Sequence, residues 1–176
     1  MRSGWLLDVY AASAGVTVWW LDKRSGQRRP FRHQFTPTFY VAGRPKLLRA
    51  AWRFLRQRPE KLHLSRQTRR ELFQGTIDLL AVGVSNPTHL QPVAFSVRRR
   101  YPQLTLYNVD VPLPLRYGAT YDLFPLCYAR LKVEGEQIVE VVPSENRWHL
   151  KPSAPPLRTL LVEPEGAARA DGYIAF

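Results

Sequence analysis

Two short apolar runs stand near the start of the chain. Residues 5–10 and 16–21 are rich in aromatic and β-branched side chains, and the small residues Ala-Ser-Ala-Gly separate them. This pattern predicts a β-hairpin. Residues 30–40 alternate between apolar and polar and predict further strands, broken at Pro37 because proline cannot donate to a strand ladder. We therefore expect residues 1–44 to be β-rich.

After Pro45 the apolar positions change to a helical period, which ends at Pro59. This period is carried by Leu47, Leu48, Ala51, Trp52 and Leu55. Beyond it the sequence predicts strands over 61–73 and 76–84 around Gln74-Gly75, a helix from Pro92 to Arg100 and a strand over 104–109. The segment 45–110 is therefore predicted to be βαβ-type. The predicted fold is a ferredoxin-like split βαβ sheet with two helices on one side.

Residues 111–176 show a less regular pattern of apolar and polar positions. Residues 111–125 are rich in proline and predict an irregular crossing, while 126–133, 137–142 and 147–150 predict a small antiparallel meander. Together these form the segment 111–156, and a new strand is expected over 157–162. The predicted class is α+β, with one domain over 1–156 and the start of another over 157–176.

The amino-acid composition excludes several classes of protein for this chain. With 176 residues and 45% hydrophobic side chains, the chain can bury a core without metal or disulfide support. The single cysteine, Cys127, excludes a disulfide framework and a multi-cysteine zinc site, and it fits a reducing compartment. No run of 18 apolar residues occurs, so we expect a cytoplasmic protein without a membrane partner.

Charge is distributed unevenly along the chain. The net charge is +12, and residues 23–70 alone carry 15 basic residues against one acidic, Glu60. Arginine supplies 21 of the 26 cations, and its planar fork suits phosphate. Nucleic acid is the leading partner, so we expect the protein to be nucleoid-associated, and docking on an acidic protein is the alternative. The candidate nucleic-acid-binding residues are Lys46, Arg49, Arg53 and Arg56 on one face of the first helix, with Arg66, Arg69 and Arg70.

No catalytic motif is evident. The four histidines are scattered, and phosphate-binding loops and nucleophile elbows are absent from the sequence. Glu163 and Glu165 are either part of a solvated loop or an oxygen-ligand pair for Mg²⁺. We expect no catalytic residue, no resident metal and no cofactor in this chain, and a degenerate nuclease using the two glutamates is a third hypothesis.

Three blocks of sequence, in order, resemble the N-terminal domain of family B DNA polymerases, above all the archaeal-type enzymes and their bacterial relatives. They are LDVY at 7–10 with FTPTFYV at 35–41, the apolar strand 77–84 with its helix ending at Tyr101-Pro102, and LYNVDVPLPLRY at 106–117 followed by Phe124-Pro125. The resemblance covers nearly the whole chain. It implies handling of single-stranded template DNA, with the remaining polymerase domains as partners in cis or in trans.

The parent family is a DNA-directed DNA polymerase with a 3′–5′ exonuclease, and its first exonuclease motif would fall at Glu163 and Glu165. Mg²⁺ is implied only where a complete polymerase or exonuclease domain follows. Archaeal members capture template uracil in a pocket of this domain, and the matching positions form a candidate base pocket: Tyr10, Pro37, Thr38, Val111, Pro112, Leu113 and Arg116. Thr38 and Leu113 replace aromatic residues of the uracil-reading enzymes, which implies weak uracil reading.

The residues themselves leave two further questions open. Exposed aromatic side chains such as Tyr40 or Trp19 beside arginines could stack on bases, or they could be core residues. Arg116 could contact a ligand, or it could bind backbone carbonyls of the proline-rich segment. The leading hypothesis is a non-catalytic polymerase domain that binds single-stranded DNA in replication or repair. The alternative is a protein-docking module of such an assembly.

Overall fold

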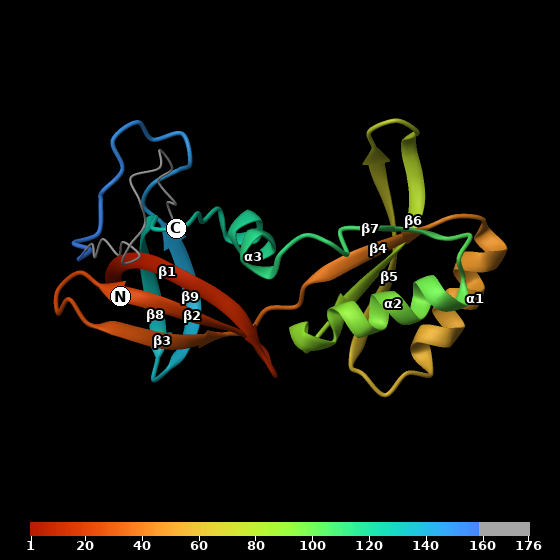
Figure 1. Ribbon diagram of the computed structural model, residues 1–176, viewed down its shortest axis with the longest axis horizontal. Coiled ribbons are helices and arrows are strands. Elements are labelled where there is room, and N and C mark those ends of the chain that lie inside the picture. The colour runs from red at the N-terminus through yellow and green to blue at the C-terminus, as the bar shows by residue number, and fades with distance from the viewer. Residues whose placement is uncertain (159–176) are drawn as a thin grey trace, which may run out of the picture.

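The computed structural model describes residues 1–158, which fold into a β-barrel and a sheet covered by helices (Figure 1). The two regions lie side by side along the longest axis of the molecule, and a short helix lies between them. The predicted α+β class is confirmed, because the described residues combine two sheets with three α-helices.

The barrel closes in the order β1-β2-β3-β9-β8. Its strands are β1 (Arg2–Ala12), β2 (Gly15–Asp22), β3 (Arg28–His33), β8 (Tyr128–Glu134) and β9 (Gln137–Pro143). All neighbours are antiparallel except β3 and β9, which are parallel. Val18, Trp20, Leu131 and Ile138 meet in one buried core, so strands from both ends of the chain enclose the same apolar interior.

The predicted antiparallel meander is confirmed for its first two strands, which pair as β8 and β9. These strands also pair with β1 and β3 and complete the barrel. The third predicted strand is wrong, because residues 147–150 form no strand. A turn prevails there, because the Asn146 carboxamide accepts a hydrogen bond from the Trp148 amide (2.9 Å) and leaves Trp148 and Leu150 83% and 96% exposed.

The second sheet has the order β5-β6-β4-β7, and every neighbouring pair is antiparallel. Its strands are β4 (Thr38–Ala42), β5 (Leu62–Glu71), β6 (Gly75–Val84) and β7 (Thr105–Tyr107). Between them run α1 (Pro45–Arg56) and α2 (Leu90–Arg100), the latter preceded by the short helix η1 (Pro87–His89). This connectivity is the split βαβ arrangement predicted from the sequence.

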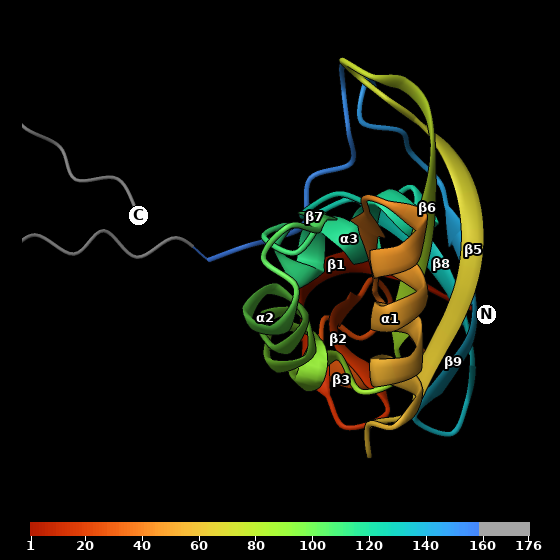
Figure 2. The same ribbon diagram turned by 90° about the vertical axis from the view of Figure 1, so that its right-hand side faces the viewer.

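Both helices cover one face of this sheet (Figure 2). Ala51 and Leu55 of α1 and Val93 and Val97 of α2 pack in one cluster with the sheet residues Phe39, Val41, Leu80, Val82 and Val84. Pro45 occupies the first turn of α1, where its missing N–H costs nothing. α2 begins two residues before the predicted Pro92, because proline is also tolerated within a first helical turn.

The predicted irregular crossing over 111–125 contains a helix, α3 (Leu113–Tyr121). Pro114 is accommodated in its first turn, and Tyr117, at 0% exposure, is buried in the barrel core. Helix formation here depends on tertiary packing more than on local propensity. The next residue, Gly118, has no room for a side chain, since a Cβ would stand 2.6 Å from the Leu123 carbonyl oxygen.

The predicted exonuclease-like segment 157–176, with Glu163 and Glu165, lies outside the described residues except for its first two positions. The domain limits stay predictions. Within residues 1–158, the structure contains no helix that is both long and apolar enough to cross a membrane.

Candidate functional site

The basic face of α1 is exposed over its whole length. Lys46, Arg49, Arg53 and Arg56 are all exposed, whereas Ala51 and Leu55 on the opposite side are buried. The helix is thus amphipathic in the sense predicted, with cations directed to solvent. Among residues 1–158, the ion pairs do not include any of these four cations.

A groove of about 390 Å³ runs between α1 and the β5–β6 hairpin. Its apolar lining includes Leu48, Leu79 and Leu80, and the half-buried indole of Trp52 contributes from α1. The polar lining residues are Arg49 and Arg53 from the helix, and Arg66 with Asp78 from the hairpin. We call this the α1–hairpin groove. It places an aromatic side chain and two guanidinium groups, neither of which forms an ion pair within residues 1–158, around an apolar floor.

Arg66 differs from the two helix arginines. Its Nη2 donates to Asp78 Oδ2 at 2.5 Å, and Thr68 Oγ1 donates to the other carboxylate oxygen at 2.8 Å. These hydrogen bonds lower the pKa of Asp78, with Arg66 as the main cause. The Asp78 carboxylate therefore neutralises part of the charge that Arg66 brings to the groove.

The seven predicted nucleic-acid-binding residues do not share one surface. Side chains alternate along β5, so Arg66 and Arg70 lie on the helix side of the sheet and Arg69 lies on the open side. On the open side Arg69 donates through Nε and Nη2 to Gln67 Oε1, at 3.2 and 3.0 Å. Only Arg49, Arg53 and Arg66 line the groove.

The basic segment 23–70 is also divided by the fold. Its first four cations, Lys23, Arg24, Arg28 and Arg29, belong to the β2–β3 end of the barrel, at the far end of the long axis from α1 (Figure 1). Residues 38–109 carry 13 basic and three acidic residues, a net charge of +10. The single positive region expected from the sequence is therefore two surfaces, of which the one around α1 is the stronger.

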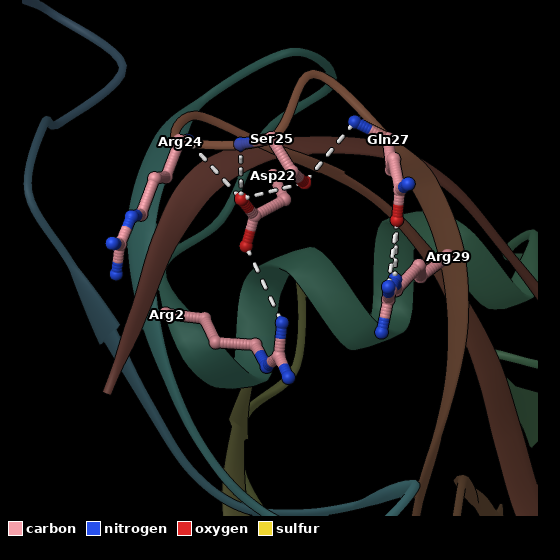
Figure 3. A network of polar contacts seen from close by, with 6 residues as sticks. All are labelled: Arg2, Asp22, Arg24, Ser25, Gln27 and Arg29. Carbon is pink, nitrogen blue, oxygen red and sulfur yellow. Dashed lines mark hydrogen bonds and ion pairs between the residues drawn. The ribbon is translucent and has the colours of Figure 1, made fainter.

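The barrel surface has its own fixed turn (Figure 3). Asp22 Oδ1 accepts hydrogen bonds from the Ser25 amide (2.9 Å), the Ser25 hydroxyl (3.0 Å) and the Arg24 amide (3.1 Å), while Arg2 lies 3.6 Å from Oδ2. The bond from the Ser25 amide is the main reason that the pKa of Asp22 is lowered. This acid is occupied in holding the turn that carries Arg24.

A second cavity, of about 520 Å³, lies where the barrel, the sheet and α3 meet. We call it the junction cavity. Four of the seven candidate base-pocket residues line it, namely Pro37, Thr38, Val111 and Arg116. The other three do not: the Tyr10 hydroxyl accepts a hydrogen bond from Trp19 Nε1 (3.2 Å), Pro112 precedes α3, and Leu113 packs against the barrel core.

The junction cavity has further lining residues outside the candidate base pocket. Tyr40, one of the aromatic side chains that could stack on a base, reaches the cavity from the open face of the sheet. Leu115, Thr120 and Tyr121 of α3 were not predicted. The α3 residues were missed because the helix was missed. The one available signal was a proline-initiated run with Tyr117 and Tyr121 four residues apart.

Arg116 binds the backbone on two sides of the junction cavity. Its Nε donates to the Val111 carbonyl at 2.9 Å and its Nη1 to the Thr38 carbonyl at 2.8 Å. Within the described chain its Nη2 is buried without a hydrogen-bond partner. Burial lowers the pKa of Arg116, and the nearby Asp110 opposes that shift. This arginine joins the proline-rich segment to β4, as the structural alternative anticipated.

Comparison with known proteins shows a similarity of fold and none of sequence family. No protein-family model matches the chain, and no curated protein matches its sequence. Among solved structures, the chain is similar to part of a family B DNA polymerase. That structure comes from the hyperthermophilic archaeon Pyrobaculum calidifontis, with a TM-score of 0.57 and 18% identity over 83% of this chain. The match spans 21% of the polymerase chain, so it covers about a fifth of that protein.

Proposed function

We propose that this chain is a polymerase-type N-terminal domain that binds single-stranded template DNA, with catalysis located elsewhere. The observation that carries the proposal is the α1–hairpin groove, where Arg49, Arg53 and Trp52 surround an apolar floor. The fold shared with part of a family B polymerase supports the assignment.

The groove has the two components that binding of single-stranded DNA requires. Exposed guanidinium groups on α1 can bind successive phosphates, and releasing the counterions of those phosphates drives binding. The half-buried Trp52 indole beside Leu48 offers an apolar face for a base. Since every base has a π-face, stacking there predicts weak sequence preference.

The junction cavity is a candidate for a single unstacked template base, with Tyr40 and the segment held by Arg116 as its walls. Thr38 supplies no ring, and Leu113 packs against the barrel core instead of lining the cavity. We therefore expect the cavity to accept a base with little discrimination.

Fluorescence anisotropy with a labelled 20-nucleotide single strand, titrated at several salt concentrations, tests the proposal. If about five phosphates are neutralised, log K should fall with log salt at a slope of roughly −3.5. Absence of binding at low salt would reject the proposal and favour the docking module, in which the same basic face contacts an acidic protein.

A further inference from the structure

The β5–β6 hairpin extends well beyond the sheet to which it belongs (Figure 1). β5 and β6 pair from Leu62↔Val84 to Glu71↔Gly75, but β4 supports β6 only from Gly83 to Leu79. Residues 68–78 therefore stand outside the sheet as a two-stranded arm. At its end Leu72 and Phe73 are 85% and 88% exposed, and neither belongs to a hydrophobic cluster of the described chain.

The end of the arm has a defined shape. Three residues, Leu72, Phe73 and Gln74, connect the Glu71↔Gly75 pair, and we call them the hairpin tip. The Glu71 carboxylate accepts hydrogen bonds from the amides of Phe73 and Gln74, both at 2.7 Å. Gly75 completes the turn at φ +75°, a conformation that other residues rarely adopt. The two apolar side chains are thus presented on a preorganised turn.

Charge around the hairpin tip favours a polyanion over other partners. Arg69 and Arg70, both exposed, directly precede Glu71, whose carboxylate is occupied with the turn amides. Arg70 also lies on the same side of β5 as Arg66, which lines the α1–hairpin groove. A DNA strand that leaves the groove along this side would therefore meet the guanidinium group of Arg70 before it reaches Phe73.

We infer that the hairpin tip is a base-contacting wedge, in which Phe73, supported by Leu72, stacks on a base of the DNA strand bound in the groove. Apolar side chains that insert between or stack on bases are a recurring device of DNA-binding proteins. The inference rests on the proposed function, because the groove must hold the strand.

The spacing makes the inference specific. Six residues of extended chain separate Arg66 from Leu72, about 20 Å at roughly 3.3 Å per residue. At about 3.4 Å per stacked base this distance corresponds to roughly six nucleotides. An oligonucleotide too short to span it, such as a 4-mer, should use the groove without the tip, whereas a 16-mer should use both.

The test compares the full chain with Phe73→Ala and with a matched control, Phe95→Ala, which removes a 63% exposed phenylalanine from α2. Phe73→Ala should weaken binding of a 16-mer about tenfold, leave a 4-mer unchanged and abolish the fluorescence change of 2-aminopurine placed along the 16-mer. Phe73→Trp should restore both signals. Phe95→Ala should bind like the native chain.

Three results would overturn the inference. If Phe73→Ala binds the 16-mer normally while Arg49→Gln with Arg53→Gln weakens it, the groove binds DNA and the tip does not contact it. If the native chain binds no oligonucleotide, the proposed function fails as well. If instead Phe73→Ala loses binding to anionic vesicles but not to DNA, the hairpin tip contacts a lipid surface.

Discussion

Arginines in two regions of this molecule have opposite environments. At the junction between barrel and sheet, Arg116 is partly buried, and two of its donors hold backbone carbonyls from separate segments. On α1, Arg49 and Arg53 are exposed, and the ion pairs of the described chain do not include them. The first arrangement stabilises the fold, and the second leaves the charge exposed to solvent, as the proposed function requires. Burial and bonding, more than residue type, separate the two environments.

Removing Arg116 should have the largest effect on stability. Arg116→Ala leaves the Val111 and Thr38 carbonyls without their donors, which should cost about 2–4 kcal/mol of unfolding free energy. For a chain of this length that is a fall of roughly 5–15 °C in melting temperature. Arg49→Ala serves as the matched control and should melt like the native chain. Equal melting of the two variants would remove the distinction between the regions.

A smaller effect should follow from pH at the same junction. His33 Nδ1 lies 2.8 Å from the Tyr117 hydroxyl, and burial lowers the pKa of His33 below its ordinary value of 6.5. Below about pH 6.5 the unfolded chain therefore binds a proton that the folded chain resists, so stability should be full above that pH and fall as the pH drops.

Urea unfolding at pH 7.5 and pH 5.5 measures this loss. The dependence should persist in His63→Gln, where the replaced histidine is exposed, and disappear in His33→Gln. A pH dependence of the same size in the His33 variant would assign it to another group.

Base identity should have the smallest effect. Oligonucleotides that differ only in one uracil or cytosine should bind within about tenfold of each other, since Thr38 supplies no aromatic ring to the junction cavity and Leu113 does not line it. Competition binding measures the ratio. A much larger preference for uracil, lost in Arg116→Ala at a temperature where that variant stays folded, would assign base reading to the cavity.

The split βαβ sheet was predictable because its signals are local. Helical spacing after Pro45, the stop at Pro59 and the turn at Gln74-Gly75 each fix an element without reference to distant residues. The same locality explains why the exposed face of α1 was predicted correctly: its period alone determines which side chains point outward.

Barrel closure and α3 depend on contacts that are distant in sequence. The parallel pairing of Arg32 with Gln137 joins segments that no local pattern connects, and α3 is held by the burial of Tyr117 in the barrel core. Neighbours in sequence also separate in space, which is why the basic segment 23–70 forms two surfaces. Pro112 and Leu113 fell outside the junction cavity for the same reason, although the preceding residue Val111 lines it.

The most direct measurement compares the native chain with the triple variant Arg49→Gln, Arg53→Gln, Arg56→Gln in both DNA binding and thermal melting. Loss of three exposed cations should flatten the salt slope by about 2, from roughly −3.5 to roughly −1.5. Because these side chains lie opposite the buried Ala51 and Leu55, the melting temperature should stay within about 3 °C. An unchanged salt slope together with a large fall in melting temperature would contradict the account, since it would mean that this face serves folding and not binding.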